Sequence, residues 1–253
     1  MIDIHSHILW GMDDGAESLE ISMSMASTAS KEGIKTIIAT PHCMEYEDPI
    51  LFSQKVRDKC LLLQENLDKK EIPIDIIPGT EVYIDPFMPD KEGFDNLVLG
   101  GTQYILVELP MNGIPLYVDD FIFHLRLKGL TPVLAHPERN ARIMEDPNIL
   151  AKLIELGSLA QINTGSITGF FGSRVQKSAR NILTHNMGHV LGTDAHSDDK
   201  RGPYIREAVK TLKNWLGKER AEEIAKTNPK SIIENDDLTV DNPLEYKKRK
   251  WIF

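Results

Sequence analysis

Two histidines near the start of the chain are separated by a single residue. His5 and His7 alternate with the apolar Ile2 and Ile4 in a stretch that also contains Asp3. Side chains on a strand alternate between its two faces, so both imidazoles and Asp3 are predicted to share one face. Two imidazoles on one face can bind one metal ion, but such a pair is common by chance. A metal site therefore requires further ligands elsewhere.

Acidic and imidazole side chains recur at the C-terminal ends of other apolar, β-branched runs. Together with the first pair and two adjacent aspartates in a glycine-flanked loop, these positions are His5, His7, Asp13, Asp14, His42, Glu81, Glu108, His136, Asp194 and His196. In a barrel of parallel strands these ends lie on one face, where active sites are built. A carboxylate in an apolar strand is costly to bury unless it is paired or bound to metal, so Glu108 supports a site for several metal ions. His124, His185 and His189 fall in predicted helices or at a strand start, and we expect structural roles for them.

The ligand types indicate which ions and which chemistry to expect. Imidazole and carboxylate ligands without thiolate favour Mn²⁺, Fe or Zn²⁺. Adjacent metal ions can activate a water molecule and hold the oxygens of a phosphoryl group. Arg139 and Arg201 follow closely after two of the ligand segments, and guanidinium groups bind phosphate through paired donors. We therefore predict that both arginines bind phosphate.

The elements that position these residues follow an alternating strand and helix pattern, which predicts an α/β fold with a mostly parallel sheet. We expect strands at residues 2–6, 36–40, 74–81, 104–108, 131–135, 160–163 and 189–193. The expected helices cover residues 17–32, 49–70, 116–128, 148–156, 173–185, 205–216 and 219–226. Residues 85–101, with several glycines and prolines, are predicted to form one long loop. A chain of 253 residues without an obvious linker is expected to form one domain.

Composition narrows the classes of partner. The net charge of -9 argues against nucleic acid as the main partner, which requires a basic face. No signal peptide or run of about 18 apolar residues is present, so we expect a cytosolic protein without membrane insertion. Cys43 and Cys60 are expected to stay reduced. Residues 243–253 form a basic tail that ends in aromatic and apolar residues, which is either solvated or docks on a neighbouring subunit or an acidic partner.

The combined motifs resemble the polymerase-and-histidinol-phosphatase (PHP) superfamily. More narrowly, they resemble its bacterial manganese-dependent protein-tyrosine phosphatases, which accompany capsular and exopolysaccharide synthesis. The motifs that carry the resemblance span nearly the whole chain and are His5-Ser6-His7, Met12-Asp13-Asp14-Gly15, Ala39-Thr40-Pro41-His42, Pro78-Gly79-Thr80-Glu81, Ala135-His136-Pro137-Glu138-Arg139-Asn140 and Thr193-Asp194-Ala195-His196.

The resemblance implies a distorted (β/α)7 TIM-like barrel with three divalent metal ions. It implies ligands in three sets, with Glu81 shared between two of them: His5, His7, Glu81 and Asp194; Glu81, Glu108 and His136; and Asp14, His42 and His196. Asp14 is preferred over Asp13 as a ligand, although sequence alone separates the two poorly. Arg139 and Arg201 would bind the phosphate, and a hydroxide bridging the metals would attack phosphorus. The implied partner is a bacterial tyrosine kinase that carries phosphotyrosine.

Four alternatives compete with this interpretation. A thiol-based tyrosine phosphatase needs a cysteine five residues before an arginine, and neither Cys43 nor Cys60 has one. A phosphatase for a small metabolite such as histidinol phosphate could use the same metals and arginines. An enzyme that hydrolyses C–N bonds would have no clear use for two phosphate-binding arginines. A non-enzymatic regulatory subunit would not need the full set of metal ligands, which is present here.

Overall fold

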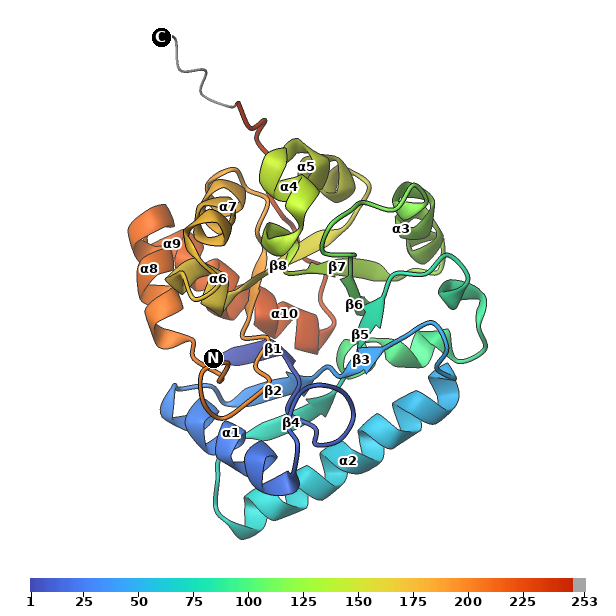
Figure 1. The fold of residues 1–253 in the computed structure, drawn as a ribbon, viewed down its shortest axis with the longest axis vertical. Helices are drawn as coiled ribbons and strands as arrows, with labels where there is room; N and C mark the ends of the chain where they lie inside the picture. Colours follow the sequence, from blue (N-terminus) through green and yellow to red (C-terminus); the bar gives the residue numbers. More distant parts are fainter. Residues whose placement is uncertain (248–253) are drawn as a thin grey trace.

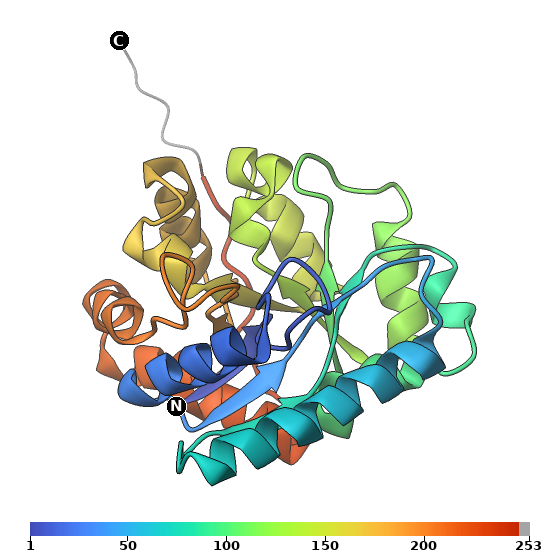
Figure 2. The same cartoon turned by 60° about the horizontal axis from the view of Figure 1, so that its bottom comes forward.

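The computed structural model describes residues 1–247 and shows parallel strands arranged around a central axis with helices outside (Figures 1 and 2). Within that range, β1 (Ile2–Ser6), β2 (Thr36–Ala39) and β4 (Asp75–Pro78) form one three-stranded sheet in the order β1-β2-β4. The second sheet has the order β3-β5-β6-β7-β8-β9 and contains β3 (His42–Cys43), β5 (Glu81–Tyr83), β6 (Tyr104–Glu108), β7 (Thr131–Ala135), β8 (Leu159–Asn163) and β9 (Val190–Gly192). Every strand pair is parallel.

The two sheets are parts of one barrel. β3 continues the line of β2 after a break at Thr40 and Pro41, and β5 continues β4 after Gly79 and Thr80. The barrel closes between its first and last strands, where the His7 N–H donates to the Ala195 carbonyl at 2.9 Å. Seven strand positions therefore surround the axis, which confirms the predicted seven-stranded barrel and explains its distortion.

Glycine is required at the break between β4 and β5. A Cβ atom at Gly79 would lie 2.7 Å from the Ile38 side chain of the neighbouring strand, closer than side chains approach in folded proteins. The break turns the chain so that Glu81, two residues later, begins β5 with its side chain fully buried.

The larger helices cover the outside of the barrel and begin at residues close to those expected. They are α1 (Leu19–Lys31), α2 (Pro49–Lys69), α3 (Val118–Leu127), α5 (Asn148–Glu155), α7 (Ser173–Thr184) and α8 (Arg206–Leu216). Side chains cap two of them: Ser18 accepts from an amide of α1, and Asp48 accepts from two amides of α2. These caps satisfy backbone donors that helix starts leave free, so local sequence fixes where α1 and α2 begin.

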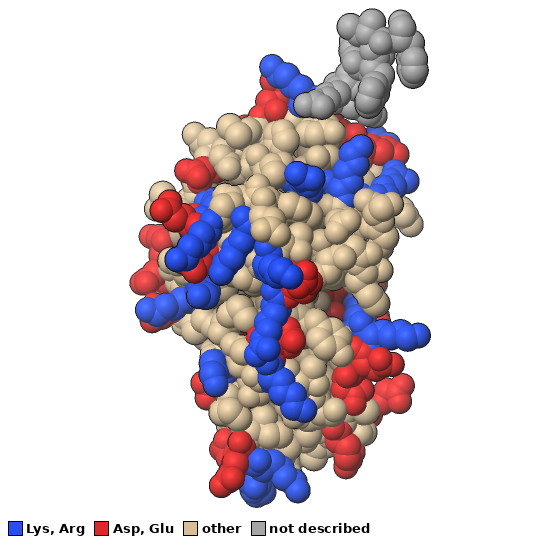
Figure 3. All heavy atoms as spheres, turned by 90° about the vertical axis from the view of Figure 1, so that its left-hand side faces the viewer, with Lys and Arg blue, Asp and Glu red and all other residues tan. Residues whose placement is uncertain are grey.

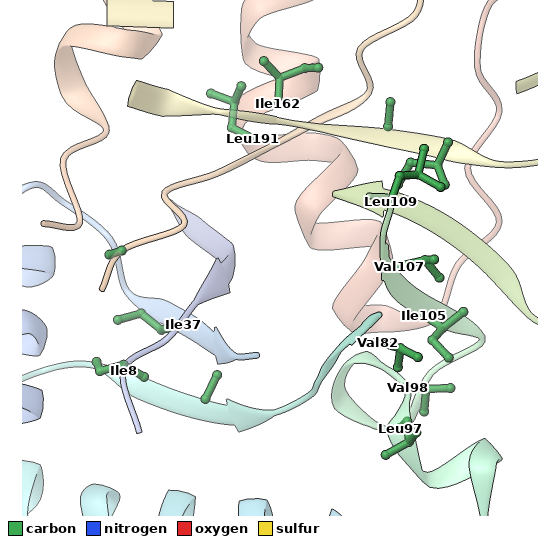
Figure 4. Packing of buried hydrophobic residues seen from close by; sticks show 14 of the residues in the cluster. Ile8, Ile37, Val82, Leu97, Val98, Ile105, Val107, Leu109, Ile162 and Leu191 are labelled. Carbon is green, nitrogen blue, oxygen red and sulfur yellow. The ribbon is translucent and has the colours of Figure 1, made fainter. Parts of the chain in front are cut away.

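Apolar residues form two buried layers on either side of the strands. Ile105 and Val107 of β6 belong to the cluster between the strands and the outer helices, and Figure 4 shows them beside Val82 of β5. Tyr104 and Leu106, which alternate with them, belong to a second cluster that includes α10 (Asn228–Glu234). Both faces of the strands are buried, as expected for a parallel sheet covered by helices.

Some elements differ from the sequence-based expectation. The predicted loop over residues 85–101 contains three short 3₁₀ helices, η1 (Met88–Asp90), η2 (Phe94–Leu97) and η3 (Leu99–Gly101). Buried apolar side chains hold them to the barrel, including Phe94, which is 1% exposed. The predicted helix at 219–226 is divided into α9 (Lys218–Glu222) and a π-helical turn, η5 (Glu223–Thr227). The short helices α4 (Ala141–Glu145) and α6 (Thr164–Thr168) and the longer α10 were not predicted.

The described part of the C-terminal tail lies on this chain's own helices. The Leu244 N–H donates to the His185 carbonyl at 2.9 Å, and the Tyr246 N–H donates to the Asn148 side chain at 2.8 Å. The rings of His185 and Tyr246 meet edge to face with their centroids 5.3 Å apart. These contacts hold residues 244–246 between α5 and α7, although Leu244 is 52% exposed. Whether the tail is solvated or docks on a partner stays a prediction, and residues 248–253 lie outside the described residues.

Both cysteines are free and buried, which confirms the expectation of no disulfide. Burial raises the pKa of each of the Cys43 and Cys60 thiols to about 12. A thiol with such a pKa is almost entirely protonated at neutral pH and is a poor nucleophile. The structure therefore gives Cys43 no nucleophilic role despite its place beside His42.

His189 has the structural role expected for it and makes stability depend on pH. Its Nδ1 accepts from the Ala160 N–H at 2.9 Å, and burial, with a smaller effect of Arg220, lowers its pKa to about 3. Below about pH 6.5 this histidine binds a proton in the unfolded chain but stays neutral in the folded chain. The free energy of unfolding, measured by urea denaturation in chelator, should fall through this histidine by up to about 1.4 kcal/mol per pH unit between about pH 6.5 and pH 4.

The variant His189→Gln should reduce this slope. His124→Gln, which removes a half-buried histidine that pairs with the exposed Asp90, is the comparison. Equal slopes in the native chain and in His189→Gln would contradict the role of His189.

Candidate metal centre

One glutamate lies among four imidazoles at the C-terminal ends of the strands. Glu81 Oε2 lies 3.2 Å from His5 Nε2, 3.2 Å from His7 Nε2 and 3.1 Å from His42 Nδ1. Its other oxygen, Oε1, lies 3.1 Å from His136 Nε2. His5 and His7 come from β1 and its end, His42 from β3 and His136 from the end of β7, so this fully buried carboxylate connects ligand candidates from three other strand positions.

A second carboxylate, Asp194, joins this group and contacts both candidate arginines. Its Oδ1 lies 3.6 Å from His5 Nε2 and 3.5 Å from His7 Nε2. Its Oδ2 accepts from Arg139 Nη1 at 2.9 Å and from Arg201 Nη2 at 2.8 Å. The two oxygens of Asp194 therefore face different partners, imidazoles on one side and guanidinium groups on the other.

The third group lies at the more open side of the site. Asp14 Oδ1 lies 3.6 Å from His42 Nε2 and 3.4 Å from His196 Nε2, and the Asp14 side chain is 68% exposed. Asp13 faces elsewhere: its Oδ2 lies 2.7 Å from His7 Nδ1 and accepts from the His42 N–H at 2.9 Å. Of the two adjacent aspartates, Asp14 faces the ligand atoms of the other histidines and Asp13 orients the ring of His7.

The structure therefore brings together all nine residues expected to bind metal. Ligand atoms of seven of them form three groups whose members lie close enough to share an ion: His7, Asp14, His42 and His196; His5, His7 and Glu81; and His42, Glu81 and Glu108. The other two lie beside these groups, His136 next to Glu81 and Asp194 next to His5 and His7. Asp3 lies outside these groups, because its carboxylate accepts from the Thr193 N–H at 2.9 Å and from the Thr193 hydroxyl. Asp3 and both histidines were expected on one face because side chains alternate along a regular strand. A bulge in β1 between Asp3 and Ser6 interrupts that alternation.

The residues present fit a metal cluster. Glu81 Oε1, Glu81 Oε2 and His42 Nδ1 are buried and have no hydrogen-bond partner among the described residues. Buried polar atoms without a partner are rare and expensive, and a cation between the carboxylate and the imidazoles would satisfy them. The donor set is nitrogen and oxygen without sulfur, which suits Mn²⁺, Fe or Zn²⁺.

Charge in the site follows from the same contacts. Burial alone would raise the pKa of Glu81, but the imidazoles of His5, His136 and His42 hold it well below its ordinary value. Burial would lower the pKa of His7, but its contacts with Asp13 and Glu81 raise it to about 10. Metal ligands must be deprotonated, so ion binding at His7 displaces protons from the site and is weaker at low pH.

Sequence reasoning missed two amides on β8 that position the ligands. Gln161 Oε1 lies 2.8 Å from His5 Nδ1, which leaves Nε2 of that ring free to face Glu81. Gln161 Nε2 donates to Asn163 Oδ1 at 2.9 Å, and Asn163 Nδ2 donates to Asp194 Oδ2 at 2.7 Å. Both alternate with the apolar Ala160 and Ile162 in the sequence, and this period of two on a predicted strand could have identified them.

Two ligand candidates have unusual backbone conformations. His136 has a φ of 33° and Asp194 a φ of 52°, in the left-handed region that residues other than glycine rarely adopt. His136 directly follows β7, and Asp194 lies two residues after the end of β9. Such conformations persist at functional sites because the surrounding structure holds them, and here they turn two side chains toward Glu81 and His5.

Comparison with known proteins places this arrangement in a family. Residues 1–234 match the family model of capsular polysaccharide synthesis proteins CpsB/CapC. The chain belongs to the CpsB/CapC family. It is 36% identical over 253 residues to the tyrosine-protein phosphatase YwqE of Bacillus subtilis, covering 99% of this chain and 98% of that protein. It is 30% identical over 241 residues to the tyrosine-protein phosphatase CpsB of Streptococcus pneumoniae, covering 92% and 98% of the two chains.

Solved structures agree with the family assignment. A chain from the crystal structures of YwqE from B. subtilis and CpsB from S. pneumoniae, metal-dependent tyrosine phosphatases, superposes with a TM-score of 0.92 at 35% identity. That alignment covers 98% of this chain and 100% of the other. Dihydropyrimidinase from Brevibacillus agri aligns over 92% of this chain and 70% of its own with a TM-score of 0.56 at 11% identity, which shows a common fold alone. The α/β barrel of this CpsB/CapC-family chain is therefore that of the metal-dependent phosphatases.

Removal of a β8 amide should weaken metal binding. The variant Gln161→Leu removes the acceptor for His5 Nδ1 and frees the imidazole to rotate, so the affinity for Mn²⁺ should fall by about 10- to 100-fold. Calorimetric titration of chelator-treated protein measures this affinity. Gln176→Leu is the matched control, because Gln176 donates to the Ile167 carbonyl and has no contact with the ligand histidines; an affinity unchanged in Gln161→Leu would reject the positioning role.

Proposed function

We propose that this chain hydrolyses phosphotyrosine on a protein substrate with the help of a cluster of three divalent metal ions. The observation that carries the proposal is the position of Glu81, in contact with four imidazoles, beside an aspartate that two arginines share. Membership of a family whose relatives are metal-dependent tyrosine phosphatases supports it.

The residues that would hold the ions are those of the three groups, with His136 and Asp194 completing them. Glu81 belongs to two of these groups, and Asp14, His42 and His196 would hold one ion, with Asp14 at the open side of the site. When bound, the ions supply a Lewis acid and lower the pKa of water. Manganese is proposed as the natural ion, because the carboxylate and imidazole donors suit it.

Arg139 and Arg201 would bind the phosphate of the substrate. Each uses one terminal nitrogen on Asp194, which leaves other guanidinium donors available, and Arg201 Nε is buried without a hydrogen-bond partner among the described residues. The Arg139 guanidinium also lies over the Phe171 ring at 4.4 Å, which fixes its plane. Two guanidinium groups held in this way can neutralise charge that builds on phosphoryl oxygens during transfer.

Apolar side chains around the site favour a polypeptide substrate over a small metabolite. Exposed residues lie on loops that follow the C-terminal ends of five strands, and these residues, named here the apolar rim, are Tyr46, Phe87, Leu116, Phe170 and Tyr204. Leu116 is fully exposed and Phe87 is 74% exposed. A metabolite that fits beside the metals would not touch such distant loops, whereas the residues flanking a phosphotyrosine would bury them. The proposed substrate is a bacterial tyrosine kinase in capsule or exopolysaccharide synthesis.

The test compares two substrates on the same Mn²⁺-loaded protein. Phosphate release from a phosphotyrosyl peptide should exceed release from histidinol phosphate by at least about 100-fold in kcat/KM, because only the peptide uses binding energy from the apolar rim. The variant Phe87→Ser should reduce this preference without changing the rate on p-nitrophenyl phosphate. Faster hydrolysis of histidinol phosphate would instead support the metabolite phosphatase.

A further inference from the structure

Charge is distributed unevenly around the mouth of the metal site. Residues 156–193, which include β8, α6, α7 and β9, contain none of the 38 Asp and Glu residues of the chain. Residues 11–30 and 41–54, which follow the ends of β1 and β2, contain four and three Asp or Glu, respectively, and no Lys or Arg. In Figure 1, α1 and α2 of these acidic segments lie at the bottom of the molecule and α7 lies at the upper left. A substrate at the site therefore meets different charges on its two sides.

Three basic residues lie in one row on the outer face of α7. Arg174, Lys177 and Arg180 recur every three residues, a spacing that places side chains on the same side of a helix. All three are exposed, and within the described residues none of them forms an ion pair, unlike Arg139 and Arg201. Figure 3 shows this side of the molecule, where Lys and Arg side chains form a band along the middle of the surface. The charge of these three residues, named here the α7 row, is available to an external anion.

The α7 row starts beside the arginines that would bind phosphate. The Phe171 ring centre lies 4.4 Å from the Arg139 guanidinium carbon, and Phe171 lines a cavity of about 80 Å³ together with Arg201 and the exposed Lys200. Arg174 follows Phe171 by three residues, so their Cα atoms are at most about 11 Å apart. The first charge of the row therefore lies close to the place where the phosphate of a substrate would bind.

The length of the row sets which residues of a substrate could reach it. From Arg174 to Arg180 the helix rises about 9 Å. With the separation from Phe171 added, the row covers distances of roughly 11 to 20 Å from the arginines. An extended polypeptide advances about 3.3 Å per residue, so these distances correspond to roughly three to six residues.

We propose that the α7 row and Lys200 bind Asp and Glu residues that lie about three to six positions from the phosphotyrosine of a protein substrate. The inference rests on the proposed function and adds the charge of the polypeptides that the site prefers. Lys and Arg side chains at the rim of a binding site attract acidic partners and speed their association. A substrate with such a flank would be drawn to the site before its phosphate is bound.

Exposed acidic residues on other loops make this preference directional. Glu17 and Glu20 lie on the segment that carries Asp14, and Glu45 precedes Tyr46 of the apolar rim. Like charges placed against each other across an interface weaken binding. These carboxylates would repel an acidic flank that ran toward α1 or α2, so the flank should run toward α7.

A polypeptide fits the α7 row better than other anions do. Nucleic acid and anionic lipid carry the same sign of charge, but neither brings a phosphotyrosine to the site from which the row extends. The acidic segments on the other side of the mouth would also repel an extended polyanion. Among the described residues, no helix is both long enough and apolar enough to span a membrane.

The test compares three phosphotyrosyl peptides of equal length on the Mn²⁺-loaded full chain. One is neutral, and the other two carry glutamates three to six positions before or after the phosphotyrosine. At low salt, kcat/KM for at least one acidic peptide should exceed that for the neutral peptide by about tenfold. High salt should reduce this difference, because it screens exposed charges.

Two matched charge reversals assign the preference to α7. Arg174→Glu with Lys177→Glu should abolish the preference for the acidic peptide. Lys70→Glu with Lys128→Glu makes the same change in net charge at the C-terminal ends of α2 and α3, where both lysines are exposed, and should leave most of the preference in place. Both variants should hydrolyse p-nitrophenyl phosphate at the native rate, since none of the four residues lies among the metal or phosphate ligands.

The outcomes separate this inference from the proposed function. Equal kcat/KM on all three peptides would overturn the inference and leave the tyrosine phosphatase in place, whereas inactivity on every peptide would reject the proposed function as well. A preference that survives in the Arg174→Glu, Lys177→Glu variant would also overturn the inference and assign the α7 row to nucleic acid or anionic lipid.

Discussion

The variant Glu81→Gln should lose metal and activity together. Glu81 is the carboxylate that contacts His5, His7, His42 and His136, so a neutral amide in its place removes the charge that more than one ion needs. The amide nitrogen of the glutamine could also donate a hydrogen bond to an imidazole nitrogen whose lone pair is needed to bind a metal ion. Phosphate release should fall by at least about 10³-fold, and elemental analysis should find fewer ions per chain.

A second buried glutamate provides the control. Glu138 is also fully buried, but burial raises its pKa, whereas the imidazoles around Glu81 lower the pKa of that carboxyl. Glu138 Oε1 accepts from the Asn163 N–H at 2.9 Å, an interaction that the amide oxygen of Glu138→Gln can reproduce. Glu138→Gln should therefore keep its metal content. Native metal content in Glu81→Gln would exclude Glu81 as a shared ligand.

The variant Arg139→Ala should lose activity and keep its metal. Arg139 is partly buried, with 18% of its side chain exposed, and donates to Asp194 on the oxygen that faces away from the imidazoles. Arg201 and Asn163 still donate to that oxygen when Arg139 is removed, so Asp194 should stay in place. Loss of one guanidinium that binds the phosphate should lower kcat/KM by about 10²- to 10³-fold.

Arg142 offers a comparison on the same segment of chain. Its guanidinium pairs with Glu145 at the surface, and its side chain is 59% exposed. Arg142→Ala should have native kcat/KM and native metal content. If Arg139→Ala released metal, its main role would be to hold Asp194; if it kept the native kcat/KM, the arginine would have no part in phosphate binding.

Most of the barrel could be predicted because each strand is a short apolar run bounded by turn residues. The sequence places β6 and β7 at their observed residues, since both runs are aromatic, β-branched or otherwise apolar apart from Glu108 at the end of β6. The 3₁₀ helices between residues 88 and 101 could not be predicted in this way. These short helices are held in place because Phe94 and Leu97 pack into the core with residues that are distant in sequence. A local sequence pattern does not predict such contacts.

The ligand candidates could be predicted for a different reason. Parallel strands bring their C-terminal ends to one face, so His42, Glu81 and His136 converge although they are far apart in sequence. The separation of Asp13 from Asp14 could not be predicted, because it depends on the path of a single loop that turns one carboxylate toward His7 Nδ1.

The hydrogen bonds of both arginines to Asp194 were equally inaccessible to sequence analysis. Arg139 follows β7 and Arg201 lies nine residues after β9, and only the folded barrel brings both guanidinium groups to one carboxylate oxygen. Their meeting depends on the left-handed backbone of Asp194 and on the closure of the loop before Arg201, whose carbonyl accepts from the His196 N–H at 2.9 Å. Such geometry has no signature in residue type or spacing.

The most direct test of the metal-dependent mechanism is phosphate release from a phosphotyrosyl peptide by protein stripped with chelator and then supplied with Mn²⁺ in steps, with bound metal measured at each step. We predict that the stripped protein is inactive and that activity returns as the cluster fills, with full activity at three ions per chain. Hydrolysis at the full rate by protein shown to contain no metal would contradict the role assigned to Glu81 and the histidines around it.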